Sequence, residues 1–396
     1  MNIVAHRIEM DVNNKQASAL RQHCGAARVA FNHALCDFKK GLEEDEWRND
    51  KTLRPRFNKV KHMEYPWLKE LSANAAKNAI VHCGEAIDKW RKGKKSKRKV
   101  GFPQFRSIKR TGCRYQADNG AGSVKVDGKQ VKLPKIGWLK MRETPRFNGL
   151  ARKAFIKERG GRWFITLTFA RPDDPPKRAI GEIIGIDAGL KHLAVLSDGA
   201  KHESPKPLKR LLRKLRMLNK KLSRQQKGGN RRKRAVAKLS KLHCRTACIR
   251  LDHLHKTTTE ITNRVGLKEL RMETLSVKGM MQNRRLARAI ADAGIHEFQR
   301  QIEYKSRWKG VSVSKAERWF PSSKLCHVCG EKNDALKLAD RSWKCVCGAE
   351  LDRDVNAALN LAASSAVCGR GESVRLAIAS NSQRSVHQTD YHRFYG

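Results

Sequence analysis

The chain has 396 residues, and its 85 lysines and arginines against 38 aspartates and glutamates give a formal net charge of +47. Hydrophobic residues make up 39% of it, enough to build cores and to exclude a disordered polybasic protein. A charge this large repels itself unless a polyanion neutralises it, which favours nucleic acid as a partner. No run approaches the roughly 20 apolar residues of a membrane-spanning helix, and the N-terminus does not resemble a signal peptide, so we expect a cytoplasmic protein without a membrane partner.

The N-terminal part predicts one strand followed by a small helical module. Residues 3–12 alternate loosely between apolar and polar side chains, which indicates a strand. From Leu20 to Phe38 the apolar residues recur at steps of three and four, the pattern of an amphipathic helix. A second helix is predicted over residues 73–90, and we expect the helices to form one module at residues 13–94.

A cationic run follows the helices and leads into aromatic residues. The run covers residues 91–99, and Phe102 and Phe105 stand just beyond it among further cations. A charge run by itself is usually a linker or an exposed face. Aromatic side chains among cations suit contact with phosphates and stacking on bases or sugars, so we favour phosphate contact here.

Residues 123–169 change to a period of two, which predicts several short antiparallel strands. Two hairpin signals interrupt the alternation, at Asp127-Gly128 and at Gly160-Gly161. We expect a small β-barrel to which the first strand adds. The barrel domain is therefore predicted at residues 1–12 and 95–177, where a proline-rich stretch ends it.

Beyond this boundary the sequence predicts two strands and a long basic helical hairpin. The strands cover residues 183–187 and 192–196. Leucines line one face of residues 208–222, a glycine-rich turn follows, and the apolar pattern resumes at Val236. Lysine and arginine crowd the other faces, with few acids to pair them. This favours a surface for a nucleic-acid duplex over an ordinary solvated hairpin.

Acidic residues in the second half of the chain could bind divalent metal ions. Hydrolysis of a phosphodiester needs an activated water, a stabilised leaving oxygen and a neutralised phosphate, which two ions about 3.5–4 Å apart supply. Magnesium prefers carboxylates and retained waters as its ligands. Asp187 closes an apolar strand, and Glu273 interrupts an apolar segment in which an unpaired charge is costly. Asp352 and Asp354 open an alanine-rich helix.

Each of these acids also has an ordinary structural interpretation. Asp187 alone could form a turn or cap a helix, and Glu273 alone could be a salt-bridged strand residue. Asp352 and Asp354 could cap the N-terminus of their helix, a position that aspartate favours.

Four of the 11 cysteines have the spacing of metal ligands. In a reducing cytosol cysteines are thiols or ligands rather than disulfides. Two close pairs predict a closed tetrahedral zinc site that is structural rather than catalytic, formed by Cys326, Cys329, Cys345 and Cys347. The second pair has one intervening residue where two are common. Cys244 and Cys248, near three histidines, resemble a second site, but we interpret them as helix-face residues because only one pair there has ligand spacing.

Four motifs follow one another in the second half of the chain. They are Gly185-Ile186-Asp187-Ala188-Gly189, then Glu273 with Leu275-Ser276-Val277-Lys278-Gly279-Met280, then Phe320-Pro321-Ser322-Ser323-Lys324-Leu325-Cys326-His327-Val328-Cys329-Gly330, then Asp352-Arg353-Asp354-Val355-Asn356-Ala357-Ala358. In this order they closely resemble the TnpB family, the RNA-guided nucleases of insertion-sequence transposons and relatives of the type V CRISPR effectors. The resemblance extends over nearly the whole chain, and its motifs are most specific in the C-terminal half.

The resemblance implies a multidomain α/β fold. It predicts an RNase H-like (RuvC) nuclease domain with an inserted zinc ribbon, and it identifies the barrel as a wedge domain and the helices as a recognition module. The nuclease domain would comprise residues 178–325 and 348–366, and the ribbon residues 326–347. Residues 367–396 would form a flexible tail.

The resemblance also assigns the site and the partners. Asp187, Glu273 and Asp354 would be the catalytic acids and would bind Mg²⁺ or Mn²⁺, with Asp352 as a supporting neighbour, while Zn²⁺ would occupy the cysteines. A guide RNA from the transposon end would direct cleavage of both strands of a double-stranded DNA target beside a short flanking motif. Such a protein would be prokaryotic and associated with the nucleoid. The sequence leaves its oligomeric state open, and we favour a monomer.

Other functions remain open at this point. RNase H-like sites also join DNA strands, so the chain could be a strand transferase, that is, a transposase. It could be a guide-dependent DNA-binding regulator without cleavage, although the presence of all three acids weighs against that. It could also be a CRISPR-associated effector, which an adjacent repeat array would indicate.

Overall fold

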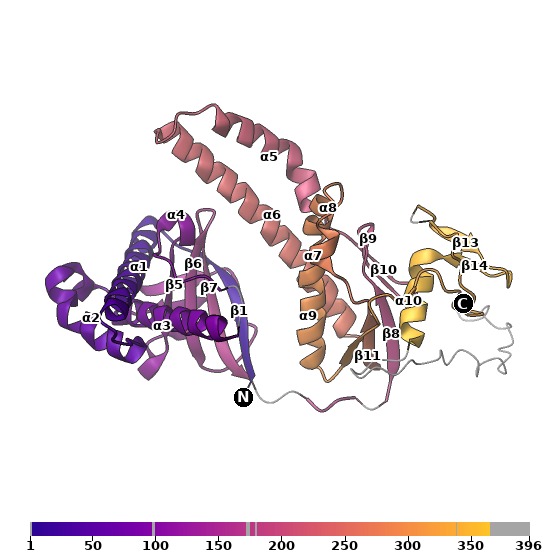
Figure 1. The fold of residues 1–396 in the computed structure, drawn as a ribbon, viewed down its shortest axis with the longest axis horizontal. Helices are drawn as coiled ribbons and strands as arrows, with labels where there is room; N and C mark the ends of the chain where they lie inside the picture. Colours follow the sequence, from indigo (N-terminus) through magenta and orange to yellow (C-terminus); the bar gives the residue numbers. More distant parts are fainter. Residues whose placement is uncertain (1, 97–99, 172–174, 179, 338, 365–396) are drawn as a thin grey trace. The chain divides into compact units, whose positions relative to one another are not determined.

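The computed structural model describes five stretches of the chain, residues 2–96, 100–171, 175–178, 180–337 and 339–364. The tail predicted at residues 367–396 lies outside them, as does the end of the cationic run. The chain divides into two compact units, which we describe separately (Figure 1). The first holds residues 1–173 and 217–244, and the second holds residues 174–216 and 245–396.

The first unit is built on an antiparallel sheet of seven strands. They are β1 (Asn2–Asp11), β2 (Arg114–Asp118), β3 (Lys125–Asp127), β4 (Gln130–Leu133), β5 (Gly137–Met141), β6 (Ala151–Arg159) and β7 (Arg162–Arg171). Their order is β2-β6-β7-β1-β5-β4-β3. The structure thus confirms both predicted hairpins, and it confirms that the first strand joins this sheet, between β7 and β5. Closure of the sheet into a barrel remains a prediction, because β2 and β3 end this order.

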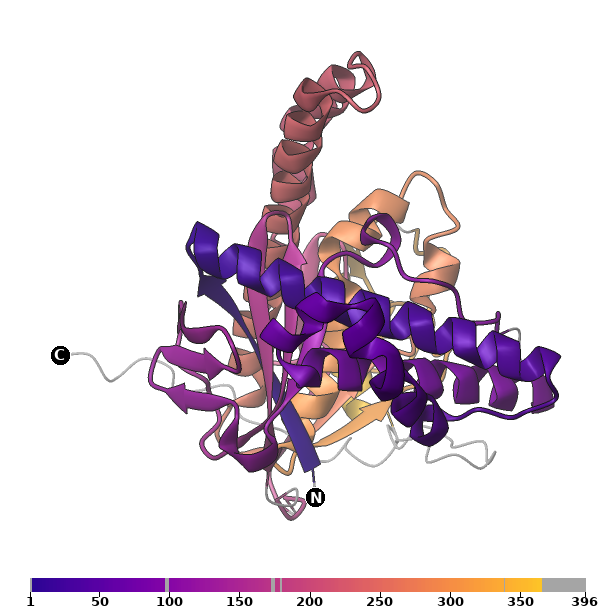
Figure 2. The same cartoon turned by 90° about the vertical axis from the view of Figure 1, so that its left-hand side faces the viewer.

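The helices of the first unit pack beside that sheet. They are α1 (Asn14–Glu43), α2 (Asp50–Glu64), α3 (Ala73–Lys95) and the short α4 (Ile108–Thr111), with 3₁₀ turns η1 (Pro66–Glu70) and η2 (Gly120–Gly122). α1 packs against α3, and both contact β2 (Figure 2). The sequence did not predict α2, because it contains Pro55 and buries only Leu53 and Phe57, too few apolar residues for a periodic pattern.

The second unit is built on a mixed sheet of five strands. They are β8 (Glu182–Asp187), β9 (His192–Leu196), β10 (Lys201–Glu203), β11 (Leu267–Met272) and β12 (Ser312–Lys315), in the order β10-β9-β8-β11-β12. β8, β11 and β12 run parallel, whereas β9 and β10 are antiparallel to their neighbours. The central strands are apolar on both faces, with residues 184–186 of β8 buried, as expected where helices cover a sheet.

Six helices and a small hairpin complete the described elements. They are α5 (Pro207–Ser223), α6 (Asn230–Thr262), α7 (Val277–Met280), α8 (Ala287–Ala293), α9 (Ile295–Arg307), α10 (Arg353–Ala363), β13 (Ser342–Lys344) and β14 (Glu350–Asp352). The core of the second unit joins its strands to α6 and α9, through residues such as Ile186, Leu270, Leu254 and Phe298. Among the helices that the structure describes, none is long and apolar enough to cross a membrane.

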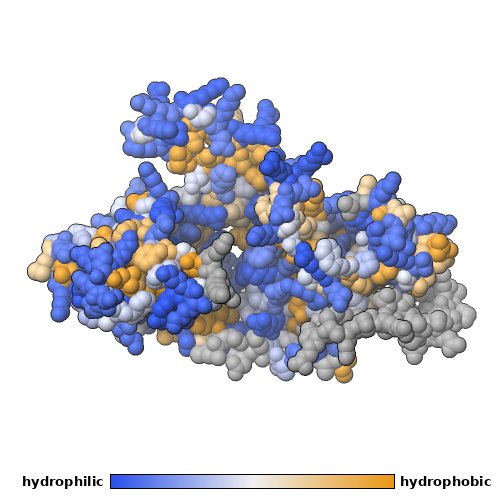
Figure 3. Space-filling view, viewed as in Figure 1, coloured by the Kyte–Doolittle hydropathy of each residue, from blue (hydrophilic) through white to orange (hydrophobic). Residues whose placement is uncertain are grey.

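α5 and α6 form the predicted basic hairpin, and the division between the two units falls inside both helices. Within α5 only Pro207 and Leu215 are fully buried, and Met217 is exposed. Hydrophilic side chains cover the upper side of this hairpin in Figure 3, and apolar side chains follow its lower side. Cations therefore dominate one side of this hairpin and apolar side chains the other.

Candidate active site and cysteine cluster

Asp187 and Glu273 come from neighbouring parallel strands of the second unit. Asp187 is the last residue of β8, and Glu273 directly follows Met272, the last residue of β11. The register pairs Met272 with Ile186, so each acid stands one residue beyond the last matched pair. Both carboxylates therefore lie at the carboxyl edge of the sheet, where open α/β sheets bind their ligands.

The third acid is brought to this edge by the packing of α10 on β8. Gly185 makes that packing possible, because a Cβ there would stand 1.9 Å from the carbonyl oxygen of Ala358 and 2.6 Å from the amide nitrogen of Ala362. Asp354 lies one turn before Ala358. Its carboxylate interacts electrostatically with that of Asp187, two residues beyond Gly185.

The environment of Asp187 disfavours its negative charge. Burial is the largest cause, and the nearby Glu273 and Asp354 carboxylates add repulsion, which together raise the pKa of Asp187 to about 8. Burial also raises the pKa of Glu273, against the opposing effects of a hydrogen bond from Ser322 and the charge of Arg353. The edge of the sheet thus concentrates carboxylates whose repulsion a cation would relieve.

Cations and a hydroxyl contact these acids in the structure. Asp354 Oδ1 lies 3.7 Å from both Arg341 Nη1 and Arg353 Nε. The hydroxyl of Ser322 donates a hydrogen bond of 2.7 Å to Glu273 Oε1. Glu273 directly follows its strand and its carboxylate accepts from a hydroxyl, which does not match the alternative of a salt-bridged strand residue.

Asp352 has the capping role that its sequence position allowed. Its side chain accepts from the backbone amides of Asp354 and Val355, and so caps α10. Lys201 Nζ also donates to Asp352 at 2.7 Å. Asp352 is exposed, whereas Asp187, Glu273 and Asp354 are partly buried. These contacts separate the roles of two aspartates that the sequence alone left equivalent.

The four predicted cysteines converge. Their sulfur atoms all lie within 4.8 Å of one another, with Cys326 and Cys345 buried and Cys329 and Cys347 exposed. Each pair turns at a glycine with positive φ, Gly330 or Gly348. A backbone hydrogen bond from Ala349 is the largest cause that lowers the pKa of Cys347 to about 7. Against a backbone hydrogen bond, burial and hydrogen bonds with the other sulfurs raise the pKa of Cys329 to about 12, so one thiolate is favoured in the cluster. The four sulfurs can hold one metal ion, despite the single residue between the second pair.

Of the His, Cys, Asp and Glu side chains that the structure describes, these cysteines alone form a group of three or more close enough to hold an ion as they stand. The three acids lie near one another but not at that spacing. Cys244 and Cys248 lie on α6 and are outside the cluster, in agreement with their interpretation as helix-face residues.

Two buried asparagines, which sequence reasoning did not single out, connect the cysteine segment to α10. Asn360 Nδ2 donates to the carbonyl oxygens of Ser322 and Leu325, at 2.8 and 2.7 Å. Asn356 Nδ2 donates to the same Leu325 carbonyl, and its Oδ1 accepts from the amide of His327. The signal was present, since two asparagines four residues apart share one face of an alanine-rich helix.

Three protein-family models match the chain. OrfB_IS605, described as "Probable transposase", matches residues 166–284, and "Cas12f1-like, TNB domain" matches residues 296–361. HTH_OrfB_IS605, a "Helix-turn-helix domain", matches residues 1–46, a range that contains β1 and α1. The first two matches cover both the acids and the cysteines.

Curated relatives align over most of the chain. A Streptomyces pristinaespiralis protein named "Putative RNA-guided DNA endonuclease" is 32% identical, covering 90% of this chain and 89% of the relative. "Putative RNA-guided DNA endonuclease InsQ" of Escherichia coli K12 is 27% identical and covers 94% of each chain. The solved "CRISPR-Cas12f Ternary Complex" covers 89% of this chain and 82% of its own, at 17% identity and a TM-score of 0.37, which is too low to support further conclusions.

Proposed function

This chain belongs to the OrfB_IS605 (TnpB) family, and on that premise we propose that it is an RNA-guided, metal-dependent DNA endonuclease. The observation that carries the proposal is the alignment with a relative of that name at 32% identity over 90% of the chain. The retained acids support it, because a regulator that only binds DNA has no need of three carboxylates at one sheet edge.

We propose Asp187, Glu273 and Asp354 as the catalytic acids and as ligands of Mg²⁺ or Mn²⁺. They come from three separate elements, and their repulsion contributes to the raised pKa of Asp187. Carboxylates are the ligands such ions prefer, and a divalent cation would neutralise their excess charge. When bound, the ions would supply an activated water and charge neutralisation on the scissile phosphate.

The neighbouring residues prepare this site. Ser322 fixes one oxygen of Glu273 by donating to it, which leaves the other oxygen for a cation. Arg341 and Arg353 hold positive charge beside Asp354. Guanidinium groups pair well with phosphate, so we propose that they contact the DNA backbone once cations replace them at the carboxylate.

We propose that the cysteines bind a structural Zn²⁺ in a ribbon at residues 326–347. Four thiolates form a closed tetrahedral site with no open position for a substrate. The hydrogen bonds of Asn356 and Asn360 then tie the ribbon to α10, the helix that carries Asp354. Zinc would therefore support the active site by fixing the segment that presents Ser322 to Glu273.

We propose that the nucleic acids bind the cationic surfaces of the other domains. In this assignment residues 13–94 are the recognition module, and residues 1–12 with 95–177 are the wedge domain. The nuclease domain comprises residues 178–325 and 348–366. The net charge of +47 supports this assignment, because neutralising it requires extended contact with phosphates. A guide RNA paired with its DNA target provides those phosphates.

The test is to purify the full-length protein from its host with the RNA that it retains, to sequence that RNA, and to add Mg²⁺ and a matching DNA duplex. We expect a discrete RNA and cleavage of both DNA strands. The variants Asp187→Ala and Glu273→Ala should abolish cleavage and still bind RNA and DNA, because they remove metal ligands and little phosphate contact.

Other results of the same experiment would redirect the assignment. Joined DNA ends in place of free ends would identify a strand transferase. A discrete RNA with tight DNA binding and no cleavage would identify a regulator. Random RNA would contradict the guide-dependent function, and loss of RNA binding in Asp187→Ala would contradict the role of that residue.

A further inference from the structure

The exposed face of the sheet in the first unit carries an ordered grid of polar and aromatic side chains. Directly paired residues of neighbouring strands place their side chains on the same face of a sheet. One row crosses four strands, formed by Asp127, Gln130, Lys140 and Asp11. The next row crosses three, formed by Lys125, Lys132 and Trp138.

Exposed and buried residues alternate along these strands, and the residues of the grid are the exposed ones. Trp138 and Lys140 are exposed, while the intervening Leu139 is fully buried. In β4 the residues Gln130 and Lys132 are likewise exposed. The grid is therefore the outer face of a sheet whose inner face forms core.

Trp138 presents a large aromatic surface within this grid. The residue is 43% exposed, and Lys132 Nζ lies 6.0 Å from the ring centroid. Its backbone is fixed, because Gln16 Nε2 donates to the Trp138 carbonyl oxygen at 3.1 Å while Gln16 Oε1 accepts from the amide of Asn13. An exposed indole on a fixed strand beside ammonium groups has the properties of a platform for a nucleobase and its phosphate.

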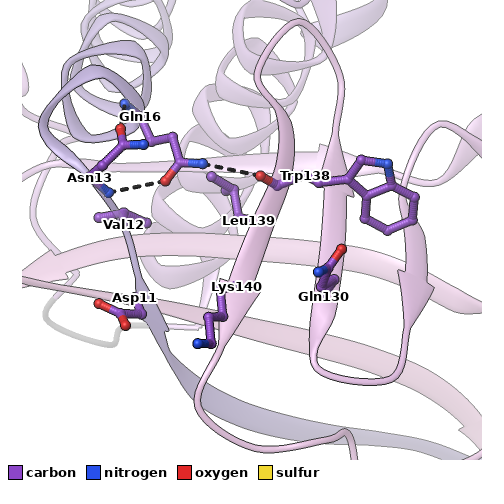
Figure 4. A pocket seen from close by; sticks show the side chains of 8 residues that line it. All are labelled: Asp11, Val12, Asn13, Gln16, Gln130, Trp138, Leu139 and Lys140. Carbon is purple, nitrogen blue, oxygen red and sulfur yellow. Dashed lines mark hydrogen bonds between the residues drawn. The ribbon is translucent and has the colours of Figure 1, made fainter.

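A cavity lies beside this platform. Its volume is about 380 Å³, within the range of roughly 300–1,000 Å³ that small-ligand sites have. Figure 4 shows Trp138 at one side of it, with Gln130 near the ring and with Asp11 and Lys140 on the other side. A carboxylate, an ammonium and an amide in one row offer both acceptors and donors to the edge of a base.

We propose that this cavity binds one unpaired nucleobase of a single-stranded nucleic acid, which stacks on Trp138 and has its edge contacted by the row containing Gln130. A duplex end could stack its outer base pair on Trp138, but the Watson–Crick edges of that pair are already hydrogen-bonded, so it would leave the polar row without a partner. The proposal rests on the proposed function only in that nucleic acid is the partner. It does not depend on the catalytic acids.

The test measures binding of fluorescently labelled eight-nucleotide single strands to the full-length protein without added Mg²⁺, at about 0.5 M salt, which weakens phosphate contacts. RNA and DNA of the same mixed sequence are compared with a duplex. We expect Trp138→Ala to weaken single-strand binding about tenfold, because stacking on an aromatic residue contributes about this much per base. Trp138→Phe should retain most of the affinity, and duplex binding should not change.

Trp67→Ala is the matched control, because Trp67 is 42% exposed in the same unit. Equal affinities for the two alanine variants would overturn the proposal, and so would an equal loss of duplex binding in Trp138→Ala. A larger effect on RNA would identify the guide as the source of the base, a larger effect on DNA a displaced strand, and equal effects a site that ignores the sugar. Cleavage assays with Asp187→Ala report on the proposed function separately.

Discussion

Gly185 and Ala358 pack so closely that no side chain fits between β8 and α10. A Cβ on Gly185 would stand 1.9 Å from the Ala358 carbonyl oxygen, far inside van der Waals contact. The obstacle is helix backbone, which cannot rotate away as a flexible side chain can. This close approach leaves room for glycine alone where the strand that ends in Asp187 meets the helix that carries Asp354.

We therefore expect Gly185→Ala to displace α10 and to damage both stability and cleavage. Overpacking of this kind costs about 1–3 kcal/mol, a decrease in the melting temperature of several degrees. Thermal unfolding and cleavage of a guide-matched duplex are the measurements. Gly25→Ala is the control, because Gly25 lies inside α1 with nothing beyond its own helix backbone within 4 Å of the new Cβ, and alanine favours a helix. Unchanged cleavage in Gly185→Ala would mean that α10 does not set the geometry of the acids.

The second prediction concerns the pH dependence of stability in the metal-free protein. The pKa of Asp187 is about 8 in the folded state, against an ordinary value near 4 in the unfolded chain. Between these values the folded state binds more protons, so stability falls as the pH rises from about 4 to 8. Asp187→Asn removes this effect, and its melting temperature should exceed that of the wild type by at least about 2 °C at pH 8.

The difference in melting temperature between Asp187→Asn and the wild type should shrink at pH 5, where Asp187 is protonated in the folded wild type. It should reverse when Mg²⁺ is added. Calorimetric scans of both proteins at the two pH values, with and without the ion, measure it. An equal increase in melting temperature at both pH values would show that titration of Asp187 does not cause the stabilisation in Asp187→Asn.

Much of this architecture was predictable because periodicity and turn chemistry are local. The hairpins at Gly128 and Gly160, the strand that ends in Asp187 and the basic helical pair all follow from such patterns. α2 was missed because its few buried residues leave no period. Local patterns fail wherever a helix is held mainly by neighbours that the sequence does not show.

The candidate site likewise has residues that the sequence identifies and residues that it does not. The acids and the cysteines are recognisable by type and position, whereas their partners come from distant segments. Ser322 reaches Glu273 across 49 residues, and Asn360 reaches Ser322 across 38. No sequence period links such positions, so only the fold identifies which hydroxyl and which amides support the acids.

The third prediction tests whether the four clustered cysteines bind zinc and whether the cysteines of α6 do not. Cys347→Ser removes one of four ligands that lie within 4.8 Å of each other, so we expect loss of bound zinc and of cleavage even though every acid is retained. Metal content by mass spectrometry and DNA cleavage are the measurements. Cys248→Ser on α6 should change neither. If Cys347→Ser keeps its zinc, or loses it and still cleaves normally, the supporting role of the ribbon is wrong.

The last prediction tests how Ser322 acts. Its hydroxyl donates to Glu273, and this hydrogen bond lowers a pKa that burial raises. Ser322→Ala removes the donor, so the pKa of Glu273 should rise further and ionisation should require a higher pH. The acidic limb of the cleavage rate against pH should then move upward by up to about one unit, since a hydrogen bond to a charged group contributes about 1.5–3 kcal/mol and water replaces part of it.

Ser322→Thr retains a hydroxyl and should show the wild-type pH profile. If Ser322 acted only by packing, Ser322→Ala should show that profile as well. The discriminating measurement is the pH at half-maximal rate under saturating Mg²⁺, with guide RNA binding measured in parallel. A uniform decrease of the rate at every pH, with no shift of the limb, would show that Ser322 positions the segment before Cys326 and does not tune Glu273.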